Sequence, residues 1–382
     1  MDITPLIGAR PVGTERNREV LAYLKQCMDS AGYRVRSLET SCQVWDWNDS
    51  FLDGYPIHPS PFSLAVHGRF PVLSISSRKE LLCSRITGKI ILLHGDIVRE
   101  PLMPKEFPFY YPDEHREMND YLESHQPAGV VALTGKHPMC GMNPYPLFED
   151  STLMVPTAYG PESLVESVGT SALLNISSRR SPASTVQLVA QQHHSSSGAP
   201  VVICSHMDTK YETPGVLDNA AGVAVMLSCM TAIGDRPKGT ADFEFIPFNG
   251  EEYCGVPGQL AYLDDLKQRS AEVRLVLNID GVLLRDSPLA LSWYNMDESR
   301  EEIIGRFLED EKEFVRGEPW YAGDHSVFAF QGIPCLALTS ADFDRALSVT
   351  HTESDTLACI DQARIEIVGE KLADLLSAFM EA

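Results

Sequence analysis

Residues 245–255 read FIPFNGEEYCG and join an apolar run to two adjacent glutamates, Glu251 and Glu252. The run is short and rich in aromatic residues, and it is typical of the end of a buried β-strand. Polar residues directly after such a strand lie where open α/β sheets place their sites. The stretch therefore predicts an α/β fold with a site at the end of this strand.

Four other stretches place histidine or acidic residues directly after a predicted strand or at a loop tip. They are His206 and Asp208 in CSHMDT, Asp218 in GVLDNAAG, Asp280 in LNIDG, and His351 in THTESDT. Successive candidate ligands, counted from His206 through Asp218, Glu252, Asp280 and His351, are 12, 34, 28 and 71 residues apart. These separations are too long for a local chelating loop, so only the tertiary fold can gather the side chains.

Each of these residues also has an ordinary structural interpretation, as a core histidine, a helix cap or a polar loop residue. In an extended H-x-D segment both side chains point the same way, so Asp208 can orient His206 as a metal ligand. Asp218 suits a helix N-cap, but its two oxygens can also bridge two cations about 3.5 to 4 Å apart. Asp280 ends a run that must be buried, where an unpaired carboxylate costs several kcal/mol. His351, in a polar turn, can complete the ligand set.

The pair of Glu251 and Glu252 supplies the chemistry of this hypothesis. A hydrolytic site with two metal ions needs one carboxylate on the metal and another that takes a proton from water. Most adjacent glutamates form solvated loop pairs, but this pair follows the apolar run FEFIPF and precedes the small residues of YCGVPG. Two histidines and three carboxylates suit zinc, with manganese or cobalt as possible substitutes.

The composition and the apolar pattern of the chain change at about residue 46. A helix is predicted for residues 15–31 and a strand for RVRSLE, after which 14 of the 25 prolines fall between residues 46 and 165. That region carries short apolar runs such as KIILLHGD and GVVALTG. These features indicate a loop-rich, mostly β domain inserted after the first helix and strand.

Regular α/β alternation returns after Gly169. The strand candidates are ALLNIS, TVQLVAQ, PVVICSH, DFEFIPF, VRLVLNI and IPCLALT, and the tail from Asp361 predicts an amphipathic helix. We therefore expect a catalytic domain made of residues 1–45 and 170–382, and an inserted domain made of residues 46–169.

Composition excludes several classes of partner. The 53 acidic and 31 basic residues give a formal net charge of −22, which repels nucleic acid and anionic lipid surfaces. The N-terminal residues do not resemble a secretory leader, and no window approaches 18 uninterrupted apolar residues, so no membrane span is expected. The nine cysteines are scattered without a C-x-x-C pair, which suits free thiols in a reducing compartment better than a zinc–cysteine site or a thiol nucleophile. We therefore expect a cytoplasmic protein.

Together the motifs resemble those of the co-catalytic dizinc aminopeptidases, the family of bacterial leucyl aminopeptidases, aminopeptidase Y and glutamate carboxypeptidase II. The ordered set is H-x-D, G-x-x-D-N-x-x-G, F-x-G-E-E, N-x-D and H-T-x-x-D-T. The resemblance implies a three-layer α/β/α fold with a mixed, mostly parallel central sheet. It also implies a zinc-dependent aminopeptidase that removes N-terminal residues from peptides by means of a metal-activated water.

The resemblance also implies a role for each motif residue. His206 and Asp280 would bind one Zn²⁺, Glu252 and His351 would bind the other, and Asp218 would bridge both. Asp208 would orient His206, and Glu251 would be the general base and later the acid. The segment GDHSVF matches a family segment whose Asp–His pair, here Asp324 and His325, lies near the site without binding metal. His325 would then either contact substrate or make a loop hydrogen bond.

Related families leave alternatives open. The insert loosely resembles a protease-associated domain, which often interrupts this peptidase fold. Glutaminyl cyclases are similar in fold and keep a similar ligand set on one zinc, but usually lack such an insert. Dizinc carboxypeptidases and acylases share HMDT, whereas DNAAG and FNGEE argue against them. A non-catalytic receptor or scaffold on the same fold would be missing a ligand or the base, and none is missing from this sequence.

Overall fold

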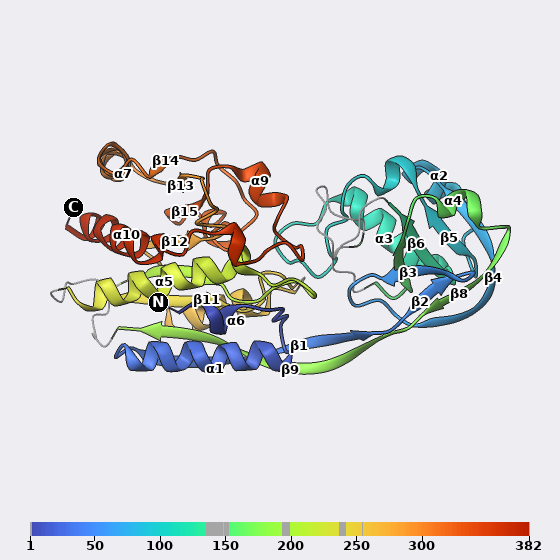
Figure 1. Cartoon of the computed structure of the whole chain (residues 1–382), viewed down its shortest axis with the longest axis horizontal. Helices are drawn as coiled ribbons and strands as arrows, with labels where there is room; N and C mark the ends of the chain where they lie inside the picture. The colour runs from blue at the N-terminus through green and yellow to red at the C-terminus, as the bar shows by residue number, and fades with distance from the viewer. Residues whose placement is uncertain are drawn as a thin grey trace. The chain divides into compact units, whose positions relative to one another are not determined.

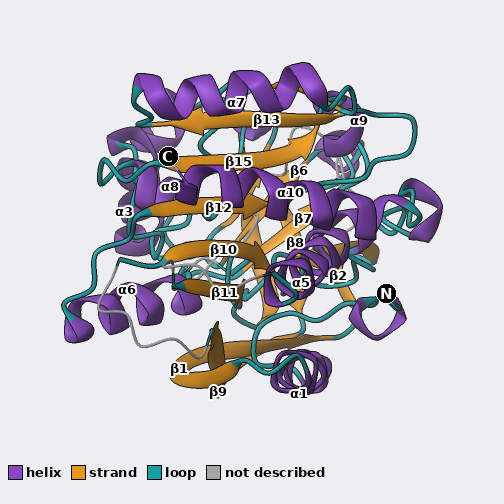
Figure 2. Cartoon of the chain, turned by 90° about the vertical axis from the view of Figure 1, so that its left-hand side faces the viewer, coloured by secondary structure: helices purple, strands orange, loops and turns teal. Residues whose placement is uncertain are grey.

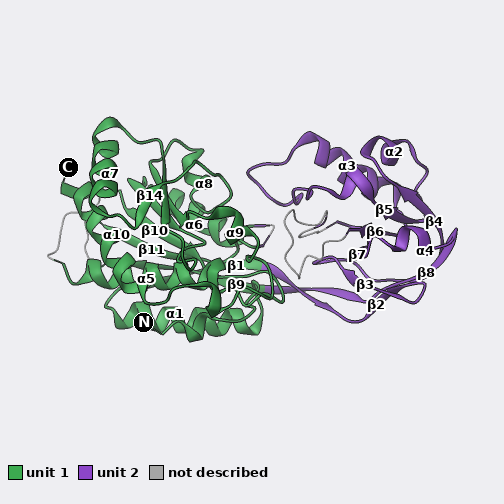
Figure 3. Cartoon of the chain, turned by 45° about the horizontal axis from the view of Figure 1, so that its top comes forward, with its two compact units in different colours: residues 1–41, 184–252, 256–382 green, residues 42–183, 253–255 purple. Residues whose placement is uncertain are grey.

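The computed structural model describes residues 2–134, 148, 153–192, 199–236, 242–253 and 255–381. The chain divides into two compact units, which Figure 3 shows in different colours. Unit 1 comprises residues 1–41, 184–252 and 256–382, and unit 2 comprises residues 42–183 and 253–255. The histidine and carboxylate motifs identified in the sequence all lie in unit 1.

A mixed eight-stranded sheet forms the centre of unit 1, in the order β1-β9-β11-β10-β12-β15-β13-β14. Its strands are β1 (Arg34–Trp47), β9 (Ser178–Gln191), β10 (Val201–His206), β11 (Phe243–Phe248), β12 (Leu275–Ile279), β13 (Leu289–Tyr294), β14 (Phe314–Arg316) and β15 (Cys335–Ser340). The neighbours β11, β10, β12 and β15 run parallel, whereas β9 and β13 pair antiparallel to β11 and β15. Figure 2 shows β13, β15, β12, β10 and β11 stacked in this order. The predicted mixed, mostly parallel sheet is confirmed.

The central strands are buried on both faces, as parallel strands covered by helices must be. Along β11, Phe243 and Phe245 join the main hydrophobic core. The alternate residues Glu244 and Phe248 face the other way, where both contact Tyr262 of helix α6. This period of two explains why the strand reads as a continuous apolar run in the sequence.

Helices cover both faces of the sheet, which gives the three layers (Figure 1). They are α1 (Glu15–Ser30), α5 (Ala221–Gly234), α6 (Pro257–Arg269), α7 (Glu298–Asp310), α8 (Ser326–Ala329), α9 (Phe343–Leu347) and α10 (Arg364–Glu381). Short turns of helix occur at Thr4–Leu6, Val216–Ala220 and Leu357–Cys359. Thr14 caps α1 by accepting a hydrogen bond from the Asn17 N–H, and the positive φ of 83° at Gly32 suits its position just after the helix end.

Helix α5 is strongly apolar, and most of its residues are buried in the main hydrophobic core. By length and composition the stretch Val216–Gly234 would suffice to cross a membrane, but 89% of its apolar window is buried inside the fold, as in a core helix. It packs directly on α10, where a Cβ on Gly369 would lie 2.3 Å from the Ser228 Oγ. Close approach of the two helices therefore requires glycine at this position.

Unit 2 contains a closed barrel with the strand order β2-β3-β7-β6-β5-β4-β8. The strands are β2 (Ser50–Leu52), β3 (Tyr55–Pro59), β4 (Val66–Ile75), β5 (Ile90–Leu93), β6 (Gly129–Leu133), β7 (Thr157–Gly160) and β8 (Ser171–Ile176). Its helices are α2 (Arg78–Cys83), α3 (Asp113–His125) and α4 (Leu164–Ser167), with a helical turn at Gly95–Val98. The predicted runs KIILLHGD and GVVALTG form β5 and β6, which pair in parallel.

The units differ from the expected domains at their borders. The contacts divide the chain at residues 41/42 and 183/184 instead of 45/46 and 169/170. The run ALLNIS was expected among the strands of the catalytic domain, but it forms β8, which pairs with β2 and β4 of the barrel. Residues 253–255 also belong to unit 2, where the Tyr253 ring meets Phe62 edge-on at 5.4 Å. An apolar strand pattern predicts burial, but it does not say which sheet the strand joins.

The C-terminal helix α10 allows a test of the core. Leu372 is fully buried in the main cluster, whereas Ile367 on the same helix is 51% exposed. We expect Leu372→Ala to lower the free energy of unfolding by about 2–5 kcal/mol, because it removes buried methyl groups and leaves a cavity. The matched control Ile367→Ala should change stability by less than about 0.5 kcal/mol. Urea unfolding curves measure both, and equal effects would contradict the placement of the helix.

Candidate metal centre

Parallel strands bring the first ligands to one edge of the sheet. His206 is the last residue of β10, Asp280 follows β12 directly, and the turn with Glu251 and Glu252 follows β11. Strand β10 lies between β11 and β12 and runs parallel to both. The carboxyl ends of the three strands therefore meet, although the residues are distant in sequence.

Asp218 lies between the two histidines. Its Oδ1 is 2.9 Å from the Nε2 of His206, and its Oδ2 is 3.0 Å from the Nε2 of His351. The residue belongs to the irregular turn Val216–Ala220 that leads into α5, and the peptide bond from Asp218 to Asn219 is cis. Each carboxylate oxygen thus faces a different imidazole.

Asp280 and Glu252 complete two ligand trios around this shared carboxylate. The Oδ1 of Asp280 lies 3.4 Å from the Nε2 of His206, and the Oε1 of Glu252 lies 2.8 Å from the Nε2 of His351. The first trio is His206, Asp218 and Asp280, the second is Asp218, Glu252 and His351, and within each the ligand atoms lie within 4.8 Å of one another. Each trio offers one imidazole and two carboxylates, which leaves a fourth position open as catalytic zinc sites require.

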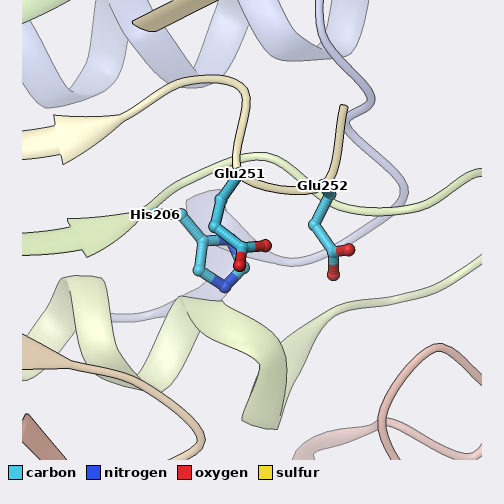
Figure 4. Close-up of side chains that lie close together, drawn as sticks. All are labelled: His206, Glu251 and Glu252. Carbon is cyan, nitrogen blue, oxygen red and sulfur yellow. The ribbon is translucent and has the colours of Figure 1, made fainter. Parts of the chain in front are cut away.

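Glu251 lies beside both trios. Figure 4 shows its carboxylate next to the His206 ring, while the Glu252 carboxylate projects separately from the same turn. Oxygen atoms of both glutamates lie within 4.8 Å of a His206 nitrogen. Burial raises the pKa of Glu251 well above its ordinary value; His206 opposes this shift, and the negative charge of Glu252 adds to it. Glu251 thus has the raised proton affinity that suits a base.

The shifted pKa values of the site residues show a cluster of negative charge that suits bound cations. Burial alone would lower the pKa of His206, yet Asp280 and Asp218 raise it well above the ordinary value. Burial also raises the pKa of Asp218, but hydrogen bonds from His206 and His351 hold it well below its usual range. Carboxylates crowded in this way require positive charge between them, and two imidazoles with three carboxylates form a ligand set that suits zinc.

Asp208 holds the glutamate turn. Its Oδ1 accepts hydrogen bonds from the N–H groups of Gly250 and Glu251 at 2.9 and 3.2 Å, and its Oδ2 accepts one from Glu252 at 3.1 Å. The same carboxylate is 3.9 Å from the Nδ1 of His206, whereas the carbonyl of Asp208 is 3.3 Å from that nitrogen. The backbone of Asp208 therefore lies nearer the imidazole than its carboxylate does. The carboxylate mainly fixes the turn that carries Glu251 and Glu252.

The start of this turn is anchored in a buried amide network. The Asn249 side chain exchanges hydrogen bonds with the Asn17 side chain at 2.8 and 3.2 Å, and it donates to the Thr185 hydroxyl at 2.8 Å. The backbone N–H of Asn249 donates to the Gln187 side chain at 2.9 Å. Buried networks of this kind restrict a loop to one conformation when every group is paired.

Asp355 fixes the backbone of the shared ligand. Its two oxygens accept hydrogen bonds from the N–H groups of Leu217 at 2.6 Å and Asp218 at 3.1 Å. The Asn219 side chain accepts the Gly222 N–H at 3.1 Å and so fills the capping role at the start of α5. Gly222 is required there, because a Cβ would lie 2.6 Å from the Ile279 carbonyl oxygen. Asn219 thus acts as a cap, and Asp218 remains directed at the histidines.

Arg10 is a buried cation that contacts the backbone of the loops next to His206 and Asp218. Its guanidinium donates hydrogen bonds to the carbonyls of Met207, Gly8, Pro214 and Gly215. It therefore joins the segment after β10 to the loop that leads to Asp218. Burial lowers the pKa of Arg10 to about 10, and nearby carboxylates limit the shift. Arg10 remains charged at neutral pH.

Asp324 and His325 are buried next to the centre. The Oδ1 of Asp324 accepts a hydrogen bond from the Gln259 side chain at 2.6 Å, and burial raises the Asp324 pKa to about 7. His325 has no exposed surface, and its Nε2 lies 2.8 Å from the Trp320 carbonyl, to which it donates. Its Nδ1 lies 3.4 Å from the Asn278 amide. Of the two interpretations given for His325, the structure favours the loop hydrogen bond, because both ring nitrogens are directed at protein groups.

Sequence reasoning assigned no role to four residues that shape the site. They are Arg10, Asn249, Lys210 and Asp355. Two of them could have been noticed in the sequence, because Lys210 follows the motif H-M-D-T directly and Asp355 is the aspartate of H-T-x-x-D-T. Arg10 lies between prolines and glycines near the N-terminus, where nothing local indicates a buried charge.

Comparison with known proteins identifies the class. Residues 187–376 match the profile of Peptidase family M28. This matched part of the chain contains both ligand trios. A probable lipoprotein aminopeptidase from Mycobacterium tuberculosis is 31% identical over 94 residues, which is 24% of this chain and 19% of that protein. The chain thus matches only about a fifth of the length of this relative.

Two solved structures are similar over nearly the whole chain. An aminopeptidase from Aneurinibacillus sp. strain AM-1 superposes with a TM-score of 0.73 and 16% identity, and it covers 98% of this chain and 90% of its own. A zinc aminopeptidase from Bacillus subtilis gives a TM-score of 0.76 and 17% identity, with coverage of 97% and 91%. At these identities the likeness establishes a shared fold.

The buried His325 leads to a prediction about pH. Burial depresses its pKa to about 4 from an ordinary value of 6.5, so the unfolded chain binds the proton more readily than the folded one. Its neutral form therefore contributes stability that is present above pH 6.5 and is lost as pH falls towards 4. Between pH 7 and 5 the loss should be about 2 kcal/mol.

The measurement compares urea unfolding of the wild type and His325→Gln at pH 7 and pH 5. Glutamine keeps an N–H donor near Trp320 but does not titrate. Both proteins should be treated with chelator, so that proton competition for metal ligands does not contribute. An equal loss of stability in the two proteins would contradict the neutral buried histidine.

Proposed function

We propose that the protein is a dizinc metallo-aminopeptidase that hydrolyses N-terminal residues from peptides. The observation that carries the proposal is Asp218, whose two oxygens face two histidines from different ligand trios. A single carboxylate shared in this way suits two cations, whereas one structural ion would need only one trio. The match to Peptidase family M28 supports peptides as the substrates.

The roles follow from the positions of the side chains. His206 and Asp280 would hold one zinc, Glu252 and His351 the other, and Asp218 both. When bound, zinc would supply a Lewis acid that polarises the peptide carbonyl and lowers the pKa of a water molecule. Manganese or cobalt would suit the same nitrogen and oxygen ligands as substitutes.

Glu251 is the proton carrier in this proposal. Its carboxylate lies beside His206 and near Glu252, and its raised pKa makes it a better base than an exposed glutamate. It would take a proton from water and give it to the leaving amine. Asp208 acts through the backbone of the turn, because its three hydrogen bonds fix Glu251 and Glu252 together.

Removal of N-terminal residues is the finer part of the proposal. Two structures of the same fold bear the name aminopeptidase, one of them described as a zinc enzyme. A free α-amino group of the substrate would bind near one of the two ligand trios, so that only the first peptide bond reaches Glu251. The inserted unit would be a protease-associated-like domain, and its closed barrel supports that proposal. A cytoplasmic location is proposed from the free cysteines.

The alternatives are less well supported. A scaffold that had lost activity would be missing a ligand or the base, and here both trios and Glu251 are complete. A glutaminyl cyclase-like acyltransferase would use one zinc, and the shared Asp218 favours two. Hydrolysis of aminoacyl-p-nitroanilides, with and without chelator, distinguishes the peptidase from both.

A pair of variants separates chemistry from metal binding. We expect Glu251→Gln to lower kcat by roughly 10²–10⁴-fold, since general base catalysis is lost, while zinc content stays near normal. Asp218→Ala should lose zinc, because both trios lose a ligand. Metal analysis beside steady-state kinetics measures both effects. Full activity in Glu251→Gln would show that its assigned role is wrong.

A further inference from the structure

Lys210 lies against the metal-ligand turn and has no role in the family motifs. Its Nζ donates a hydrogen bond to the backbone carbonyl of Glu252 at 2.9 Å and lies 3.4 Å from the Glu252 Oε2. The Lys210 side chain is only 16% exposed, and that of Glu252 is 4% exposed. A lysine ammonium therefore sits at the edge of the site next to a candidate ligand.

The two oxygens of Glu252 have different partners. Oε1 lies 2.8 Å from the His351 Nε2, within the second trio, whereas Oε2 faces the Lys210 ammonium. Rotation of the carboxylate would exchange the two oxygens and would break the ion pair. Lys210 thus favours the arrangement in which one oxygen of Glu252 is presented to the second ligand position.

The segment HMDTK holds the turn from both ends. Asp208 accepts the N–H groups of Gly250, Glu251 and Glu252, and Lys210 donates to the carbonyl that closes the turn. The negative side chain of Asp208 therefore binds the N–H groups of this short loop, and the positive side chain of Lys210, two residues later, binds its last carbonyl. Loss of Lys210 releases the end of the turn that carries Glu252.

Two effects of Lys210 on a bound cation oppose each other. Its charge neutralises part of Glu252, which weakens attraction for a cation, while its position fixes the ligand, which strengthens binding. The ammonium is closer to the backbone carbonyl than to the carboxylate, and a compact, hydrated charge at the rim is partly screened. Orientation therefore dominates, as it does for other groups that hold metal ligands in place.

We infer that Lys210 is a positioning residue for the second cation, the one held by Glu252, His351 and Asp218. The inference rests on the proposed dizinc function. It adds a residue outside the ligand set, one that would keep Oε1 of Glu252 directed towards the second ligand position. The first position, formed by His206 and Asp280, does not depend on it.

The test measures zinc bound per chain in Lys210→Met over a series of buffered free zinc concentrations. Methionine has a similar length but neither charge nor donor. We expect one of two zinc ions to bind about 10–100-fold more weakly, the usual effect of losing a group that orients a ligand. Excess zinc should restore kcat, and Lys210→Arg should keep most of the affinity. Unchanged or tighter binding of both ions would overturn the inference.

Two controls exclude a general loss of structure. Lys267→Met removes an exposed lysine that pairs with Asp264 on α6 and should leave both affinities unchanged. The metal-free melting temperature of Lys210→Met should match that of the wild type. If it does not, Lys210→Gln replaces it, because glutamine can still donate to the Glu252 carbonyl without a charge near Oε2. Zinc binding by Lys210→Gln equal to that of the wild type would then overturn the inference.

A double-mutant cycle assigns the effect to a position. His351→Ala removes a ligand of the second cation, so Lys210→Met on that background should cause no further loss of zinc. A further loss would place Lys210 at the first position and overturn the inference. Failure of the proposed function looks different, because the wild type itself would then bind fewer than two zinc ions.

Discussion

The carboxylate of Asp218, shared by two histidines, is the interaction on which the rest of the site depends. Its oxygens lie 2.9 Å from His206 and 3.0 Å from His351. These histidines come from the end of β10 and from a turn after α9, so that neither lies in the same element as Asp218. The fold must therefore bring three separate segments together at this one carboxylate. Much of the surrounding structure serves that purpose.

Backbone hydrogen bonds from charged side chains supply this precision. Asp355 holds the N–H of Asp218, Asp208 holds the glutamate turn, and buried Arg10 joins the loops that carry the first two motifs. Charged groups make stronger hydrogen bonds than neutral ones, roughly 1.5–3 kcal/mol each. Burying a charged side chain also costs free energy unless all of its hydrogen-bonding groups are paired. These buried charged groups thus restrict the site to one geometry.

The spacing of apolar residues along the sequence was enough to predict the helices and strands that depend on local sequence. The tail helix follows a 3.6-residue period, and its predicted apolar positions, such as Leu372 and Phe379, are buried. The strands after residue 184 and the ligand motifs at their ends were equally visible, because parallel buried strands read as apolar runs. The fold class and the candidate ligands could therefore be predicted from the sequence.

Contacts between distant residues could not be predicted in this way. Arg10 and Gly215 are 205 residues apart, and nothing near Arg10 marks it as buried. Strand β8 has the same apolar character as the strands of the catalytic sheet, so only its pairing with β4 shows that it belongs to the barrel. The role of Lys210 likewise depends on the direction of one ammonium group. The sequence determines such contacts through folding, but no local pattern of residues reveals them.

The place of the insertion follows from the order of the sheet. The chain leaves the catalytic unit along β1 and returns along β9, and these two strands are neighbours at the edge of the sheet. An insertion whose two ends are adjacent leaves the central strands β10, β11 and β12 undisturbed, so a large domain is tolerated there. Tyr253, which follows Glu252 directly, nevertheless belongs to unit 2, where its hydroxyl accepts a hydrogen bond from the Gln43 N–H. The turn that carries Glu251 and Glu252 is therefore followed directly in the sequence by a residue, Tyr253, that belongs to unit 2.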